Sequence, residues 1–117
     1  MLVVHERFQH PRTIQFAETD LSGAVHFTSV LRYVEEAEHS FLRAKNMPIC
    51  DGNIFLPRVH ISCDYRKPLH CFDSIIIDLE VLALGRTSTS WGFFVARDGI
   101  ICAEGKMITV SVQIMPP

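Results

Sequence analysis

Apolar residues recur every three or four positions in the stretch that begins at Phe27, and this spacing predicts one long amphipathic helix. Charged side chains occupy most of the positions between the apolar ones. The helix is predicted to end near Lys45, because Asn46 can adopt a left-handed conformation and Pro48 cannot continue a helix. The apolar positions are Phe27, Val30, Leu31, Val34, Ala37, Phe41 and Leu42.

Most of the remaining chain alternates apolar with polar residues, which is typical of strands that bury one face. The alternation predicts strands at residues 12–18 and 58–66. Three further segments, 74–84, 86–97 and 100–114, follow one another directly. Only Gly85 and the pair Asp98-Gly99 separate them, and an Asp-Gly pair favours a type I′ hairpin turn. These three segments are therefore expected to form sequential antiparallel strands.

Five strands and one helix indicate an α+β fold. Helices that would connect parallel strands are missing from the pattern, so the sheet is expected to be antiparallel and to curl around the helix. Such a sheet leaves an edge strand unpaired, which favours pairing with a second copy. We expect a homodimer or homotetramer through sheet edges. No linker divides the sequence, so residues 1–117 are expected to form a single domain.

Composition and charge narrow the class of protein. The formal net charge is -2 and the chain has no Lys/Arg run, which argues against a nucleic-acid partner. The apolar run at the N-terminus is too short for a signal peptide or a membrane span, so a cytoplasmic protein without membrane association is expected. The four cysteines form no CxxC pair and are expected to be reduced thiols.

A carboxylate stands in the short loop before the predicted helix, in the segment ETDLSGAVHF. The first N–H groups of a helix lack helical partners and carry its positive dipole end. Gly23 permits close backbone approach. A carbonyl held on the N–H of Phe27 could then face the carboxylate of Asp20, or a water that Asp20 activates. Alternatively, Asp20 only caps a backbone N–H, as Asp does in many turns.

The same segment carries a family resemblance. FAETDLSGAVHFTSVLRYVEEA resembles the active-site segment of hotdog-fold acyl-CoA thioesterases of the 4-hydroxybenzoyl-CoA thioesterase type. LPRVHISCDYRKPLHCFD resembles the next strand and loop of the 1,4-dihydroxy-2-naphthoyl-CoA thioesterase branch, and LGRTSTSW is similar to the family's hairpin before its fourth strand. The resemblance covers nearly the whole chain. It implies a five-stranded antiparallel sheet wrapped around one central helix, and hydrolysis of an acyl-CoA with an aromatic or bulky acyl group.

The resemblance also implies roles for individual residues. Asp20 matches the catalytic aspartate, acting as nucleophile or general base, and the backbone N–H of Phe27 matches the group that polarises the thioester carbonyl. His26 and His60 are candidate substrate-binding residues, although a structural role is favoured for His60, because one neutral histidine easily finds a hydrogen-bond partner. Coenzyme A is part of the substrate, so no cofactor is expected. The ligand is completed across the dimer interface in the family, with candidate CoA-binding residues Arg86, Thr87, Ser88 and Lys67.

Two other kinds of site were weighed. A metal site built on His60, Cys63, His70 and Cys71 is not expected, because alternation places His60 and Cys63 on opposite faces of one strand. Another hotdog branch carries its catalytic acid on the central helix. Here Glu35 and Glu36 are expected to be solvated or at a subunit contact, and Glu38 lies nearest the apolar stripe.

Two functions remain open from the sequence. The first is hydrolysis of an acyl-CoA thioester, and the second is a hotdog domain that binds acyl-CoA or acyl carrier protein without hydrolysing it. Asp20 favours hydrolysis, because a domain that only binds has no need for an acid facing a thioester.

Overall fold

The helix and five long strands of the protein form the arrangement that the sequence pattern predicts. The computed structural model describes residues 2–3, 6–47 and 54–113. Helix α1 (Phe27–Ala44) begins at the first apolar position of the predicted stripe. It ends one residue before Lys45, and Asn46 adopts a left-handed conformation with φ 59°. The predicted helix is therefore confirmed at both ends.

The long strands form one antiparallel sheet with the order β2-β5-β6-β7-β4. Their bounds are β2 (Arg7–Thr13), β4 (Arg58–Tyr65), β5 (Ser74–Leu84), β6 (Ser88–Arg97) and β7 (Ile100–Val110). The short strand β1 (Leu2–Val3) also pairs with β5, on the same edge as β2. Two further short strands, β3 (Ile54–Phe55) and β8 (Val112–Gln113), pair with each other.

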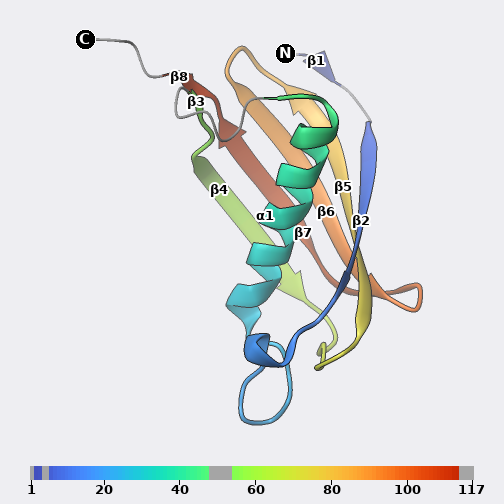
Figure 1. Ribbon diagram of the computed structural model, residues 1–117. Coiled ribbons are helices and arrows are strands. Elements are labelled where there is room, and N and C mark those ends of the chain that lie inside the picture. The colour runs from blue at the N-terminus through green and yellow to red at the C-terminus, as the bar shows by residue number, and fades with distance from the viewer. Residues whose placement is uncertain (1, 4–5, 48–53, 114–117) are drawn as a thin grey trace.

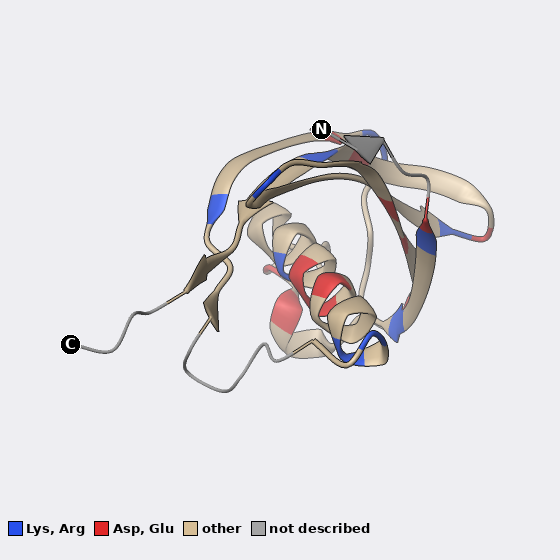
Figure 2. Ribbon diagram, turned by 90° about the horizontal axis from the view of Figure 1, so that it is seen from above, with Lys and Arg blue, Asp and Glu red and all other residues tan. Residues whose placement is uncertain are grey.

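The sheet curls around α1, which lies along its concave face (Figures 1 and 2). The apolar stripe of α1 is mostly buried between Val30 and Leu42 against the inward-facing residues of the strands, so helix and sheet share one core. Phe27, the first predicted position of the stripe, is instead 59% exposed. Burial of this apolar surface is the main force that holds the helix on the sheet. Central members of the core are Tyr33, Val34, Ala37, Ile77, Leu79, Phe93, Val95 and Met107.

The predicted strand at residues 12–18 is wrong. Strand β2 ends at Thr13, and Phe16 lies in the short 3-10 helix η1 (Phe16–Glu18) with its side chain 75% exposed. The alternation at Ile14 and Phe16 is too short to distinguish a strand from a turn. β2 includes Pro11, which an edge strand tolerates because one side of its backbone has no strand to bond. The other predicted strands agree with the structure over most of their length, and β7 ends earlier than predicted.

The hairpin between β6 and β7 has the predicted geometry. Asp98 and Gly99 both have positive φ, 53° and 76°, as a type I′ turn requires. Within the described ranges no helix has the length and apolarity needed to cross a membrane. The expected location in the cytoplasm stays a prediction, as does the single domain over residues 1–117. Cys63, Cys71 and Cys102 are free thiols, and Cys50 lies outside the described residues.

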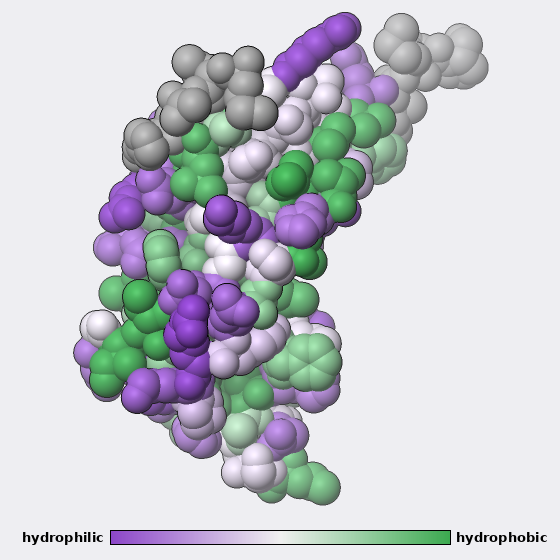
Figure 3. Space-filling model, turned by 180° about the vertical axis from the view of Figure 1, so that it is seen from behind, coloured by the Kyte–Doolittle hydropathy of each residue, from purple (hydrophilic) through white to green (hydrophobic). Residues whose placement is uncertain are grey.

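The outer face of the sheet, seen from behind in Figure 3, mixes hydrophilic and hydrophobic side chains. It carries a hollow of about 880 Å³ formed by outward-facing residues of β2, β5 and β6 and by the β6–β7 turn. The lining includes charged residues such as Arg7 and Asp78 beside apolar ones such as Ile76 and Phe94. None of the predicted site residues lines this hollow, whereas Phe27 and Lys67 line a second groove at the start of α1.

Candidate active site

The loop before α1 is a tight hairpin. Thr19 pairs with Val25, the N–H of Asp20 donates to the carbonyl of Ala24 at 2.8 Å, and the N–H of Gly23 donates to the carbonyl of Asp20 at 3.0 Å. Gly23 has a φ of 82°, a conformation that glycine adopts without strain. Asp20 therefore lies directly across the hairpin from Ala24, which is three residues before the first residue of the helix.

The hairpin is also joined to the connection between β4 and β5. The N–H of Val25 donates to the carbonyl of Leu69 at 2.7 Å, and the N–H of Cys71 donates to the carbonyl of Gly23 at 3.3 Å. Ala24 and His70 form an isolated bridge. The position of the loop thus depends on a segment almost fifty residues later in the chain.

The carboxylate of Asp20 is exposed and held by its own loop. Its Oδ1 accepts hydrogen bonds from the N–H and the hydroxyl of Ser22, at 2.8 and 2.5 Å. The hydroxyl of Ser22, followed by its backbone N–H, lowers the pKa of Asp20. Asp20 is therefore ionised near neutral pH, as a base or nucleophile must be. The sequence pattern did not single out Ser22, although Asp-x-Ser is a spacing typical of such turns.

The first turn of α1 leaves one backbone donor free. The N–H of Thr28 donates to Nδ1 of His26 at 3.3 Å, and the N–H of Ser29 donates to the carbonyl of His26 at 2.9 Å. The N–H of Phe27 donates to no described residue. It lies at the positive end of the helix dipole and is available to a ligand carbonyl.

His26 is the N-cap of α1. Its Nδ1 is 2.7 Å from the Thr28 hydroxyl and also accepts the Thr28 N–H, and its ring stacks on the ring of Phe27 with centroids 4.7 Å apart. The ring is thus held in place by the helix start that it caps. Substrate binding by His26 stays a prediction.

An apolar groove of about 310 Å³ begins at the start of α1. Phe27 forms one wall, and Tyr65 at the end of β4 forms another. The hydroxyl of Tyr65 donates to the carbonyl of Phe27 at 2.8 Å. Lys67 lies at this groove, so it stands beside the helix start and far from the hairpin that contains Arg86. The other lining residues are Val25, Val30, Arg66, Pro68, Leu69, Cys102 and Ala103.

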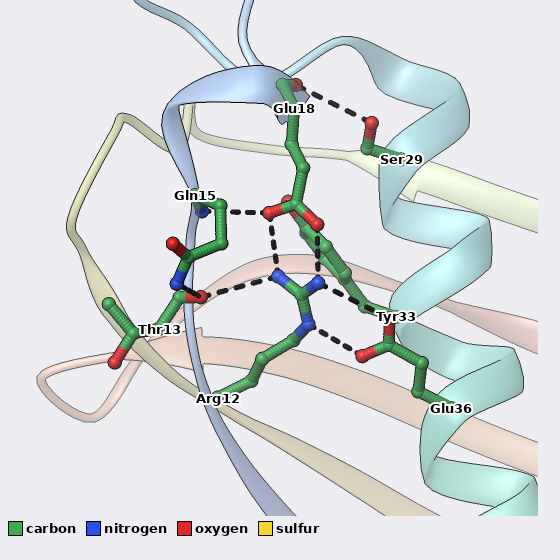
Figure 4. Close-up of polar contacts among 7 residues, drawn as sticks. All are labelled: Arg12, Thr13, Gln15, Glu18, Ser29, Tyr33 and Glu36. Carbon is green, nitrogen blue, oxygen red and sulfur yellow. Dashed lines mark hydrogen bonds and ion pairs between the residues drawn. The ribbon is translucent and has the colours of Figure 1, made fainter.

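A second acid of the loop, Glu18, has a structural role (Figure 4). Its carboxylate accepts hydrogen bonds from the Arg12 guanidinium, the N–H of Gln15 at 2.8 Å and the hydroxyl of Tyr33 at 3.0 Å. Arg12 also bonds Glu36 of α1 at 2.5 Å. Burial alone would raise the pKa of Glu18, but the hydrogen bonds from Arg12 and its neighbours lower it overall. This cluster fastens η1 to β2 and α1, and it leaves Asp20 as the acid of this loop without an arginine partner among the described residues.

The acids of α1 pair with arginines of the sheet. Glu38 is 0% exposed, and its Oε1 accepts a hydrogen bond from Arg58 at the start of β4. Arg58 also lies 3.2 Å from Glu35. The expectation that Glu35 and Glu36 are solvated or at a subunit contact is therefore incomplete, because each forms an ion pair within the chain.

Other predicted site residues lie away from Asp20 within one chain. Arg86, Thr87 and Ser88 lie at the hairpin between β5 and β6, at the opposite end of the sheet from the start of α1 (Figure 1). His60 alternates with the inward-facing Ile61 and thus points to the outer face of β4. The structure does not bring these residues to the groove in a single chain. The described residues contain no cluster suited to a metal ion.

Comparison with known proteins places this geometry in a family. Residues 22–104, more than half of the chain, match the Thioesterase superfamily. The chain belongs to the thioesterase superfamily, a family of thioester hydrolases with the hotdog fold.

Individual relatives agree with this assignment. A 1,4-dihydroxy-2-naphthoyl-CoA hydrolase of Synechococcus elongatus is 34% identical over 84 residues, which cover 68% of this chain and 62% of that protein. The crystal structure of a hypothetical protein from Aquifex aeolicus is similar with a TM-score of 0.87 at 30% identity, covering 93% of this chain and 89% of that one. A 1,4-dihydroxy-2-naphthoyl-CoA thioesterase from Synechocystis shares the fold, with a TM-score of 0.87 at 23% identity, covering 94% and 85%.

Proposed function

We propose that the protein hydrolyses an acyl-CoA thioester at the groove beside the start of α1. The observation that carries the proposal is the free N–H of Phe27, which lies at a helix N-terminus on an apolar groove. The ionised Asp20 lies in the hairpin that leads into that helix. One short segment thus holds both an N–H that can donate to the thioester carbonyl and a carboxylate. The groove gives the acyl group an apolar surface to contact.

In the proposed reaction the thioester oxygen accepts the N–H of Phe27, and the positive helix end stabilises the charge that develops on it. With Asp20 as general base, a water oxygen forms a bond to the carbonyl carbon while the water proton passes to Asp20. The carbon–sulfur bond then breaks, and the CoA thiolate takes up a proton. With Asp20 as nucleophile, a carboxylate oxygen forms a bond to the carbonyl carbon, the carbon–sulfur bond breaks and the CoA thiolate leaves, and water then hydrolyses the acyl-enzyme anhydride to the free acid and the Asp20 carboxylate.

A thioester requires little further assistance from the protein. The thiolate leaves readily, so one carboxylate and one polarised carbonyl are sufficient in principle. The proposed reaction uses no cofactor beyond the CoA that belongs to the substrate. Glu18, whose carboxylate is occupied by Arg12 and Tyr33, is not required in it.

The groove favours an aromatic or bulky acyl group. Its walls are Phe27 and Tyr65, and its floor includes Val30, Leu69 and Ala103. Aromatic rings pack favourably against such walls in offset or edge-on geometry. The curated Synechococcus relative is a hydrolase of an aromatic acyl-CoA, which agrees with this choice.

The CoA portion is proposed to reach a second copy of the chain. β4 is an edge strand that pairs with β7 on one side, and an exposed edge favours pairing with an identical strand. Antiparallel pairing of two β4 strands would place the Arg58 end of one copy beside the Tyr65 end of the other. The hairpin with Arg86, Thr87 and Ser88 lies at the Arg58 end, so the CoA-binding candidates of one copy would face the groove of the other.

The test is a panel of acyl-CoAs from short aliphatic to naphthoyl thioesters, with released CoA detected by a thiol reagent. The proposal predicts release that is fastest for aromatic or bulky acyl groups. Calorimetric titration with the same panel separates the alternative function. Tight binding of acyl-CoA without release of CoA would favour the binding domain and contradict the proposed hydrolysis.

A further inference from the structure

Tyr65 ends β4 beside the first turn of α1 and contacts Phe27 in two ways. Its hydroxyl donates to the Phe27 carbonyl at 2.8 Å, and its ring lies edge-on to the Phe27 ring with centroids 6.2 Å apart. We propose that Tyr65 is a positioning residue whose hydroxyl holds the first turn of α1, and whose ring selects the acyl group. This inference rests on the proposed function and assigns a residue that the family resemblance did not single out.

The hydroxyl acts on the peptide group that follows the free donor. The Phe27 carbonyl and the Thr28 N–H are the two ends of one planar peptide. Tyr65 bonds the carbonyl end, and Nδ1 of His26 accepts the N–H end at 3.3 Å. The preceding peptide, which carries the free Phe27 N–H, is fixed through the His26 carbonyl by the Ser29 N–H. The orientation of the Phe27 N–H therefore depends on contacts at both of its neighbouring peptides.

Tyr65 joins the start of α1 to the sheet. Two other polar contacts of this turn lead back to the preceding loop. The His26 N–H donates to the Glu18 carbonyl at 3.3 Å, and the Ser29 hydroxyl is 3.4 Å from the same oxygen. Tyr65 adds a contact from β4, which forms the other wall of the groove. A donor that polarises a carbonyl must be held to within a fraction of an ångström, because small displacements lower the rate strongly.

The ring of Tyr65 is placed to contact the acyl group. It lines the groove next to Phe27, together with the buried apolar residues Val30 and Ala103. Burial raises the pKa of Tyr65 to about 12, so the hydroxyl keeps its proton near neutral pH and can donate. The hydroxyl and the ring thus have separable effects, on turnover and on the choice of acyl group.

Two substitutions separate these effects, and both are assayed by CoA release from the acyl-CoA panel. Tyr65→Phe keeps the ring and removes the hydroxyl. It is expected to lower kcat about 10-fold for every thioester that the wild type accepts, with KM changed less than about 2-fold. Tyr65→Leu also removes the ring, and it is expected to raise KM for aromatic thioesters more than for short aliphatic ones.

Ser62→Ala is the matched control, because it removes a hydroxyl from the same strand on the opposite face. It is expected to match the wild type in kcat and KM. Wild-type kcat in Tyr65→Phe, or a loss that appears only in KM, would overturn the positioning role while leaving the proposed hydrolysis intact. A wild-type protein that releases no CoA from any thioester would instead overturn the proposed function, and the role of Tyr65 with it.

Discussion

The buried pair of Glu38 and Arg58 supports a quantitative prediction about how the helix is held on the sheet. Glu38 is 0% exposed, its Oε1 is bonded by Arg58, and its Oε2 accepts no hydrogen bond from a described residue. Burial raises the pKa of Glu38, although Arg58 opposes the shift. Arg58→Met removes the positive charge and keeps an apolar stem of similar length. The variant therefore leaves a buried carboxylate without its cation.

Loss of one partner of a buried ion pair costs about 3–5 kcal/mol. Arg58 keeps 23% of its side chain exposed, so the lower part of that range, about 3 kcal/mol, is expected at pH 7. Glu38→Gln removes the buried charge and is expected to change the free energy of unfolding by no more than about 1 kcal/mol. The double variant should be more stable than Arg58→Met alone, with a coupling energy of about 2 kcal/mol.

The cost in Arg58→Met should depend on pH. A raised pKa means that the folded protein holds its proton on Glu38 more tightly than the unfolded chain does. Protonation removes the buried charge, so the destabilisation is largest at neutral pH and diminishes as the pH falls through the raised pKa of Glu38. Glu35 lies 3.2 Å from Arg58 and His39 lies 3.8 Å from Glu38, and both residues are present in all the variants compared.

Urea unfolding at pH 7 and pH 5 measures both effects. Trp91 is the single tryptophan and is 2% exposed, so its fluorescence reports loss of the core. Protein concentration must be equal in all samples, because association with a second copy shifts apparent stability. The buried-charge argument would be refuted if Arg58→Met lost the same free energy of unfolding at both pH values. It would also be refuted if Glu38→Gln lost as much free energy of unfolding as Arg58→Met.

Three further predictions concern the active site. Ser22→Ala removes the hydroxyl that lowers the pKa of Asp20, so the acid limb of the kcat/KM profile should move to higher pH. An unchanged pH profile would show that the Asp20 carboxylate does not act in catalysis. Arg86→Ala should raise KM more than it lowers kcat, because a phosphate contact is made in ground and transition states alike. Mixing Arg86→Glu with Asp20→Asn should restore part of the activity if two copies share each site, and no restoration would contradict the shared site.

Periodicity was sufficient to predict the helix and most strand positions. The stripe of α1 repeats over many residues, and β5 alternates over eleven, so each pattern has one interpretation. Residues 12–18 contain too few alternating positions, and the bonds of Glu18 to Arg12 and Tyr33 turn the chain into η1 there. These contacts depend on where Arg12 and Tyr33 lie in the folded chain, and the alternation of apolar and polar residues does not contain that information.

The candidate site also has a part that could be predicted from the sequence and a part that depends on the folded structure. Asp20, Gly23 and Phe27 lie within eight residues of one another, so their proximity in one loop could be predicted from the sequence. The catalytic role of Asp20 was implied by the family resemblance and stays a prediction. Tyr65 reaches Phe27, and Arg58 reaches Glu38, because β4 lies beside α1 in a particular register. That register follows from the packing of the whole sheet. The position of Arg86 relative to Asp20 depends further on how two copies associate.

The central claim is that the carboxylate of Asp20 acts in thioester hydrolysis, and its most direct test is CoA release by Asp20→Asn. Asp98→Asn is the matched control, since Asp98 is an exposed acid in a turn that Asn-Gly also favours. Both proteins should show wild-type Trp91 fluorescence. Asp20→Asn is expected to lower kcat at least about 100-fold, while Asp98→Asn is expected to keep wild-type activity. A folded Asp20→Asn protein that releases CoA as fast as the wild type would contradict the central claim.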